Sequence, residues 1–389
     1  MPSSTFDFDN APDRRHGDSL KWNKYAGRDI LPLWVADTDF AAPPPVLAAL
    51  TQRVAQGCLG YSVPMPSLVD AVCTSLQREY AWSIKPEWLV WLPGLVTGIN
   101  VACRAIDGDV VTATPIYPPF LSAPGLSGKQ LAAVPLRCVD NRWEWDFAAL
   151  EAALTPETRL LLLCHPHNPV GRVWTKDELT RLADLCKRHD LLVCSDEIHC
   201  GLILEPGLVH TPLAALDADM AERCITLMAP SKTYNIPGLG CSFAVIANAA
   251  LRQRFTQATR GIVPDVNVLG LVAAEAAYRD GEDWRRALIE VLRRNRDRVQ
   301  AAVAGMPGLH MAPLEATYLA WIDARGLGVV DPVAFFEAAG VGLSNGRDFG
   351  LLGWVRLNFG CTSKTLDLAL ERMNTACHAV SSSGIVHSR

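Results

Sequence analysis

The sequence lacks the features that mark membrane proteins, nucleic-acid-binding proteins and secreted proteins. No uninterrupted apolar run approaches the length of a membrane span. The formal net charge is −5, and no Lys/Arg run is interleaved with aromatic residues, so nucleic-acid binding has little support. The first ten residues lack the basic segment and the apolar stretch of a secretion signal. These absences predict a cytoplasmic protein with neither a membrane nor a nucleic-acid partner.

Cysteine is present in twelve copies, but no two of them form a Cys-x-x-Cys pair. Several, including Cys164, Cys194 and Cys224, fall inside apolar runs, where they are typical of reduced core residues in a cytosolic protein. His165 and His167 form a His-x-His motif, but no cysteine or acid stands near them at ligand spacing. We therefore predict no metal site.

The chain is long enough for more than one core. At 389 residues, with 49% apolar and 20% charged residues, it suits a large domain beside a smaller one. The predicted strands of the first part are 88–92, 110–112, 159–164, 191–195, 224–228 and 241–246, and the predicted helices include 96–105, 147–154 and 176–188. Strands that are apolar throughout and separated by helices predict an α/β fold with a mainly parallel sheet covered on both faces.

The pattern changes after about position 265. A long charged amphipathic helix is predicted at 284–304, followed by strands at 317–322 and 353–359 and by helices at 332–339 and 364–378. This pattern indicates a smaller α+β domain. We expect an N-terminal segment, 1–45, packed on the small domain or on a second subunit, then a large domain, 46–282, and a small domain, 283–389.

Lys232 and Asp196 form the pair with the clearest chemistry. Asp196 directly follows the apolar run 191–195, and ligands of open α/β sheets collect beyond the carboxyl ends of the strands. A lysine among small and turn-forming residues, with an acid at the end of an earlier strand, is what pyridoxal 5′-phosphate (PLP) chemistry requires. The amine forms a Schiff base with the cofactor aldehyde, and the carboxylate keeps the pyridine nitrogen protonated. Taken alone, the aspartate is more often a helix cap and a lysine a surface charge, so the pair needs support from other motifs.

Three further motifs follow predicted strands. The side-chain amide of Asn168 can donate a hydrogen bond to the ring hydroxyl oxygen of PLP. The peptide bond from Asn168 to Pro169 is of the kind that can adopt the cis form. Gly94 begins a strand-to-helix turn in which the N–H groups of Leu95 and Val96 suit a phosphate. Tyr117, held between prolines, suits stacking on a flat heterocycle. Each has an ordinary alternative, namely an Asn-Pro turn, a plain strand-to-helix turn and a core aromatic side chain.

Arg356 lies in the apolar run 353–359 of the predicted small domain. A guanidinium in such a place favours a bidentate anion, and the α-carboxylate of an amino acid fits. An internal salt bridge is an equal alternative for this residue taken alone.

Together these motifs resemble the class I/II aminotransferase superfamily, the fold-type I PLP enzymes, and within it the MalY/PatB group of cystathionine β-lyases (C–S lyases). Two strings are specific to that group, Trp34-Val35-Ala36-Asp37 and Asp196-Glu197-Ile198-His199. The resemblance also covers Phe6-Asp7-Phe8-Asp9, Gly60-Tyr61-Ser62-Val63-Pro64, 115–120, 166–174, the Lys232 segment, 315–321 and 356–359. It implies the PLP-dependent transferase fold, with a mainly parallel seven-stranded sheet in the large domain.

The resemblance also implies a role for each motif residue. Lys232 carries the Schiff base, Asp196 pairs with the ring nitrogen and Tyr117 stacks on the ring, which makes these three the expected catalytic residues. The other implied cofactor contacts are Asn168, Gly94, Leu95, Val96, Ser231, His199 and Tyr61, the last of which reaches the phosphate of the neighbouring subunit in a homodimer. The implied substrate contacts are Arg356, Ala36 and Asn168.

Two positions favour a lyase over an aminotransferase. His199 stands where aspartate aminotransferase-like relatives place a tyrosine, and Gly240 stands where they place a phosphate-binding arginine. Gly201 departs from the lyase group, which usually has an aspartate there. The resemblance implies a C–S β-lyase that converts cystathionine, cysteine or S-substituted cysteines to a thiol, pyruvate and ammonia. The alternatives are an aminotransferase of the same fold and a PLP-fold protein with a regulatory or interaction role.

Overall fold

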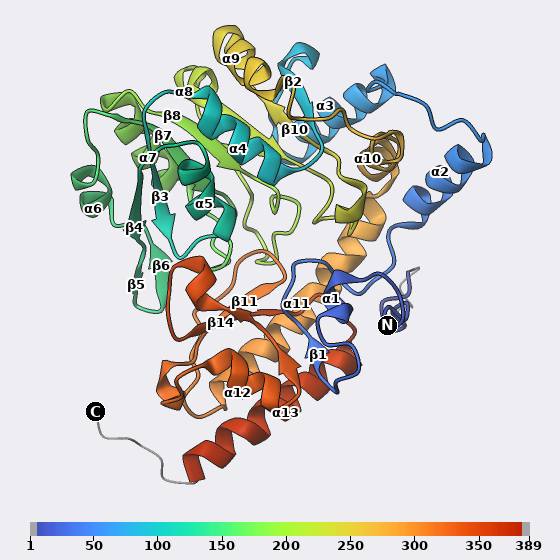
Figure 1. Cartoon of the computed structure of the whole chain (residues 1–389), viewed down its shortest axis with the longest axis vertical. Helices are drawn as coiled ribbons and strands as arrows, with labels where there is room; N and C mark the ends of the chain where they lie inside the picture. The colour runs from blue at the N-terminus through green and yellow to red at the C-terminus, as the bar shows by residue number, and fades with distance from the viewer. Residues whose placement is uncertain (1–5, 383–389) are drawn as a thin grey trace.

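A seven-stranded sheet forms the centre of the molecule in the computed structural model, which describes residues 6–382 (Figure 1). The strand order is β2-β10-β9-β8-β7-β3-β4, and only β10 runs antiparallel to its neighbours. The bounds are β2 Leu89–Leu92, β3 Asp109–Thr114, β4 Leu131–Pro135, β7 Thr158–Cys164, β8 Leu192–Asp196, β9 Cys224–Met228 and β10 Ser242–Val245. The predicted α/β fold with a mainly parallel seven-stranded sheet is therefore confirmed.

Helices cover both faces of this sheet, because its central strands are apolar on both sides. On one face, residues of α4 (Leu95–Ala105), α5 (Pro118–Leu126) and α9 (Ala249–Thr259) join the core. On the other face lie residues of α3 (Pro66–Tyr80), α7 (Lys176–Arg188) and α10 (Val268–Asp280). The shorter helices α6 (Phe147–Ala152) and α8 (Ala218–Arg223) also contribute to that second core.

The C-terminal part builds a second, antiparallel sheet below the first in Figure 1. Its strands, in the order β11-β14-β13, are β11 Leu319–Asp323, β13 Ser344–Asn345 and β14 Trp354–Asn358. The long helix α11 (Glu282–Ala304), α12 (Pro332–Ala338) and α13 (Ser363–Ser382) accompany this sheet, and their apolar residues share one core with it. No helix within residues 6–382 is both long enough and apolar enough to cross a membrane.

The N-terminal residues lie beside these C-terminal elements. Strand β1 (Leu31–Pro32) pairs in parallel with β12 (Val341–Gly342), and Arg372 of α13 forms an ion pair with Asp29 at 2.9 Å. Helix α1 (Leu20–Asn23) precedes β1, and α2 (Pro44–Ala55) leads on to the large sheet, where it packs on α10. The domain boundaries expected at 45 and 282 stay a prediction.

The observed elements differ from the predicted ones mainly at the edge of the large sheet. Helix α7 begins with the capping box formed by Thr175 and Glu178, and its bounds agree with the predicted helix 176–188. Strand β4, the edge strand, was not predicted, because its short apolar run contains two alanines and ends in a proline, and both residue types are depleted in strands. A hairpin of β5 (Arg137–Val139) and β6 (Arg142–Glu144) follows it and was also missed.

Candidate active site

The carboxyl ends of β7 and β8 bring the first motif residues together. Cys164 and Asp196, the last residues of these strands, are paired in register. The loop after β7 is held against both neighbouring strands, because His165 N donates to Asp196 O at 2.9 Å and Tyr117 N donates to Asn168 O at 3.1 Å. The peptide bond from Asn168 to Pro169 is cis, as the sequence suggested. The loop therefore places the Asn168 side chain beside Asp196.

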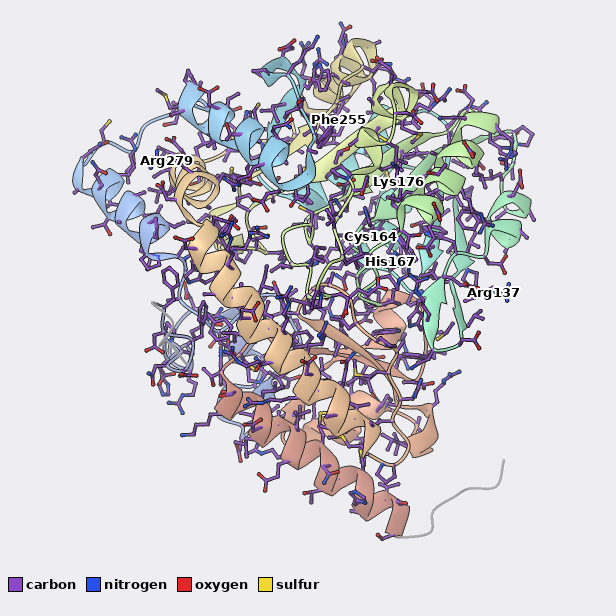
Figure 2. The ribbon with its side chains drawn as sticks, turned by 180° about the vertical axis from the view of Figure 1, so that it is seen from behind. Arg137, Cys164, His167, Lys176, Phe255 and Arg279 are labelled. Atoms are coloured by element: carbon purple, nitrogen blue, oxygen red, sulfur yellow. The ribbon has the colours of Figure 1, made fainter. Side chains whose placement is uncertain are left out.

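A cavity of about 170 Å³ lies at this edge. Ten of the residues predicted as site residues line it, namely Ala36, Gly94, Leu95, Val96, Tyr117, Asn168, Asp196, His199, Ser231 and Lys232. Cys164, Ile198 and Pro237 complete the lining, and no motif had pointed to them as site residues. In Figure 2, the labelled Cys164 and His167 lie in the middle of the molecule, between the large sheet and the C-terminal elements.

Asp196 is buried and Lys232 is half-buried, and each has few partners for its charge. One Asp196 oxygen, Oδ1, accepts a hydrogen bond from Ile198 N at 3.1 Å, and burial raises the pKa of this carboxyl group to about 7. Lys232 Nζ donates to Ala36 O at 2.6 Å. Burial lowers the pKa of this amine to about 8 against the opposing effect of the Asp37 charge. A cationic heterocycle between the two groups would favour the charged form of the aspartate and the neutral form of the lysine.

Arg356 enters from β14 and contacts the cavity through Asn168. Its Nη1 donates to Asn168 Oδ1 at 3.0 Å and its Nη2 donates to Trp34 O at 3.0 Å, while Nε is buried without a partner. The guanidinium lies over the Phe349 ring at 4.6 Å. Burial lowers its pKa to about 10, so it stays charged at neutral pH. Because Asn168 Oδ1 accepts from the arginine, its amide nitrogen is left to face the cavity.

The start of α4 offers hydrogen-bond donors to the cavity. Gly94 is the N-cap of this helix, and Leu95 and Val96 are its first residues, so their N–H groups have no acceptor within the helix. Gly240 faces this turn in a left-handed conformation (φ +56°), and a Cβ there would lie 2.9 Å from Pro93 O. No side chain at 240 reaches the turn, and the helix N-terminus with Ser231 supplies the anion-binding groups on this side of the cavity.

His199 is a neutral group in this site. It is buried, its Nδ1 has no hydrogen-bond partner, and its ring stands edge-on to Tyr318 at 6.3 Å. Burial, together with the charges of Lys232 and Arg356, lowers its pKa to about 3. The imidazole is therefore uncharged at neutral pH.

The chain before α2 forms one wall of the site through its backbone carbonyls. Trp34 O accepts from Arg356, Ala36 O from Lys232, and Asn235 Nδ2 donates to Phe40 O at 2.7 Å. Tyr318 also donates its hydroxyl to Ala36 O at 3.1 Å, and no signal in its local sequence singled it out. Tyr318 immediately precedes β11, and only the fold brings it next to residues so distant in the chain.

Tyr61 is the one predicted residue that the structure leaves away from the cavity. It is fully exposed, and its neighbours Ser62 and Val63 line a separate surface hollow. Within this chain, Tyr61 therefore contributes nothing to the cavity, and its expected contact with a neighbouring subunit stays a prediction. Among residues 6–382, no group of three or more His, Cys, Asp or Glu side chains is placed to hold a metal ion.

Comparison with known proteins places this geometry in a family. The model of the family "Aminotransferase class I and II" matches residues 28–373. The cystathionine β-lyase PatB of Bacillus subtilis is 36% identical over 95% of this chain and 99% of its own length.

Solved structures agree over nearly the whole length. The crystal structure of OvoB has a TM-score of 0.94 at 53% identity and covers 96% of this chain and 99% of the other. Cystalysin from Treponema denticola, whose crystal structure contains a PLP cofactor, has a TM-score of 0.92 at 33% identity, with coverage of 96% and 99%. The chain therefore belongs to the class I and II aminotransferase family and has its fold-type I architecture.

Proposed function

We propose that this chain is a PLP-dependent carbon–sulfur β-lyase that acts on cystathionine, cysteine or S-substituted cysteines. The observation that carries the proposal is the convergence of Lys232, Asp196, Asn168 and Arg356, from four distant segments, on one buried cavity or its edge. The likeness to PatB, named a cystathionine β-lyase, supports the reaction type. The PLP in cystalysin supports the cofactor.

The residues present fit PLP. Asp196 is a buried carboxylate that a protonated ring nitrogen would satisfy, and Lys232 presents an amine to the same cavity. The N–H groups of Leu95 and Val96 suit the phosphate, and the Asn168 amide suits the ring hydroxyl. When bound, PLP supplies a ring that accepts the electron pair left at Cα.

The protein's own groups would then carry out the proton transfers and the positioning. Arg356 takes the substrate carboxylate through its unpartnered Nε and so fixes the direction of the Cα–H bond. Lys232, with its pKa lowered toward 8, accepts the Cα proton as a general base. Asp196 would keep the proton on the ring nitrogen, which stabilises the electron pair left at Cα until that pair expels the thiolate from Cβ. With one water consumed, the products are a thiol, pyruvate and ammonia, so cystathionine would give homocysteine.

A direct assay tests this activity. Purified protein incubated with PLP and cystathionine, without any keto acid, should release pyruvate and ammonia in equal amounts. The Lys232→Ala variant serves as the control and should release neither. Turnover by that variant would refute the assigned base.

An aminotransferase is the second candidate, because the family includes such enzymes by name. It would convert the amino acid to a keto acid only while a second keto acid is supplied. Strict dependence on an added keto acid, without release of a thiol, would favour it over the lyase.

We also propose a homodimer with shared sites. The segment around Tyr61 exposes several large apolar side chains to solvent, namely Leu59, Tyr61, Val63 and Met65. Mixing the inactive variants Lys232→Ala and Tyr61→Ala should restore part of the activity, because a mixed dimer holds one intact site. No recovery after verified subunit exchange would contradict the shared site.

A cytoplasmic location is proposed as well. All twelve cysteines are free thiols, which suits a reducing compartment. Cell fractionation with an antibody to the protein would test the location.

A further inference from the structure

A second buried carboxylate stands directly behind Asp196. Glu197 follows strand β8, and its side chain lies on the same side as Ser195, away from the cavity, because successive residues of an extended chain point to opposite faces. Ser195 Oγ donates to Glu197 Oε1 at 2.8 Å, and Leu213 N donates to the same oxygen at 3.2 Å. His210 Nε2 lies 2.7 Å from Glu197 Oε2. Both carboxylate oxygens are therefore held by neighbours in the core.

The two histidines near this carboxylate are neutral. His165 Nδ1 accepts from Trp174 N at 3.4 Å, so the ring proton sits on Nε2, which donates to Thr211 O at 3.1 Å. His210 carries its proton on Nε2 toward Glu197, and its buried Nδ1 has no partner. A second proton, on His210 Nδ1, would have no acceptor. The centre of the His165 ring lies only 4.3 Å from that of the His210 ring. Burial lowers the pKa of each ring to about 3.

No cation neutralises Glu197 among the groups that face it. The ionisable groups that face Glu197 are the two histidines, Asp196 and the thiols of Cys200 and Cys224. Burial raises the pKa of both thiols, so both stay uncharged. Burial raises the pKa of Glu197 to about 7, and its three hydrogen-bond donors favour the ionised form. At pH 8 the glutamate is thus an anion held by dipoles alone.

We propose that Glu197 is a second anion that assists Asp196 in keeping the ring nitrogen of PLP protonated. The inference rests on the proposed cofactor. Glu197 does not touch the cavity, so it acts through the electrostatic potential at the position of the nitrogen and is not itself a catalytic residue. For two unit charges roughly 10 Å apart, an effective dielectric constant of about 20 gives a shift of a protonation equilibrium of roughly ten- to twentyfold.

The test compares two ligands that differ only at this nitrogen. Affinities for PLP and for 1-deazapyridoxal phosphate, in which a C–H group replaces the nitrogen, are measured at pH 8 with the wild type and with Glu197→Gln. The variant is nearly isosteric, since its amide oxygen can accept from Ser195 and Leu213, and its amide nitrogen can donate to His210 Nε2 when the ring proton of His210 moves to Nδ1. We expect its preference for PLP over the analogue to fall roughly ten- to twentyfold. The matched control Ser195→Ala removes one of the three hydrogen bonds to Glu197 but no charged group, so its preference should fall less than that of Glu197→Gln.

The outcomes separate the inference from the proposed function. An equal loss of affinity for both ligands in Glu197→Gln, or no loss at all, would overturn the role of Glu197 and leave PLP binding intact. Failure of the wild type to bind PLP would overturn the proposed cofactor itself. If Glu197→Gln does not fold, infrared spectroscopy of the wild type with labelled glutamate decides: an ionised Glu197 at pH 8 supports the proposal, and a protonated one overturns it.

Discussion

Replacing Arg356 by lysine should weaken substrate binding more than it slows the reaction. The guanidinium is anchored by two hydrogen bonds, to Asn168 and Trp34, and keeps Nε free of protein partners. A lysine keeps the charge, but its ammonium cannot hold both anchors and present a parallel pair of N–H groups to a carboxylate. Losing one charge-assisted hydrogen bond costs about 1.5–3 kcal/mol, which corresponds to a fall in kcat/KM of roughly 10- to 150-fold.

Steady-state kinetics with cystathionine would measure this effect. Most of the change should appear in KM, because the carboxylate does not react and is bound equally before and during the reaction. The exposed Arg347 offers a matched control, and Arg347→Lys should behave as the wild type. Bound PLP, followed by its visible absorbance, should be retained in both variants. A fall in kcat at unchanged KM, or no change in kcat/KM, would refute the carboxylate role of Arg356.

Three further predictions concern a proton, a contact and an ion pair. Burial lowers the pKa of Lys232 to about 8, and the amine accepts a proton only in its neutral form. The rate of exchange of the substrate Cα–H in deuterated water should therefore rise from pH 6 and level off above about pH 8. A flat pH profile would contradict the role of Lys232 as the base. Gly201→Asp should lower the free energy of unfolding by about 1–3 kcal/mol in urea titrations, because the Cβ of the new side chain would lie 2.6 Å from Thr233 Oγ1. An unchanged unfolding midpoint would contradict this prediction. Arg172→Met should lower the free energy of unfolding by about 3–5 kcal/mol in the same assay, because it leaves the carboxylate of Glu315, 2.9 Å from the buried guanidinium, without this partner. A variant as stable as the wild type would show that this ion pair is dispensable.

The fold was predictable where the strands are buried on both faces. The runs at β7, β8 and β9 are mostly apolar, and each predicted strand lies within one residue of the observed bounds. Edge strand β4 was missed because its short run contains two alanines and a proline, which are depleted in strands. The reversed direction of β10 could not be predicted either, because the apolar pattern of one strand carries no information about its neighbours.

The site was predictable where a motif follows a strand. Asp196 ends β8 and Asn168 lies in the loop after β7, and strand ends of a parallel sheet meet at one edge. Tyr318 and the wall of backbone carbonyls from Trp34 onward were not predictable, because a carbonyl looks the same in every residue and the contacts join segments far apart in the chain. Glu197 appeared only as part of a family string, and its burial became visible with the fold.

The most direct test of the account is to locate the cofactor on the chain. Reduction of the PLP-loaded protein with borohydride, followed by proteolysis and mass spectrometry, should find the reduced cofactor attached to Lys232 alone. Attachment at another lysine, or no attachment to a protein that still cleaves cystathionine, would contradict the central assignment.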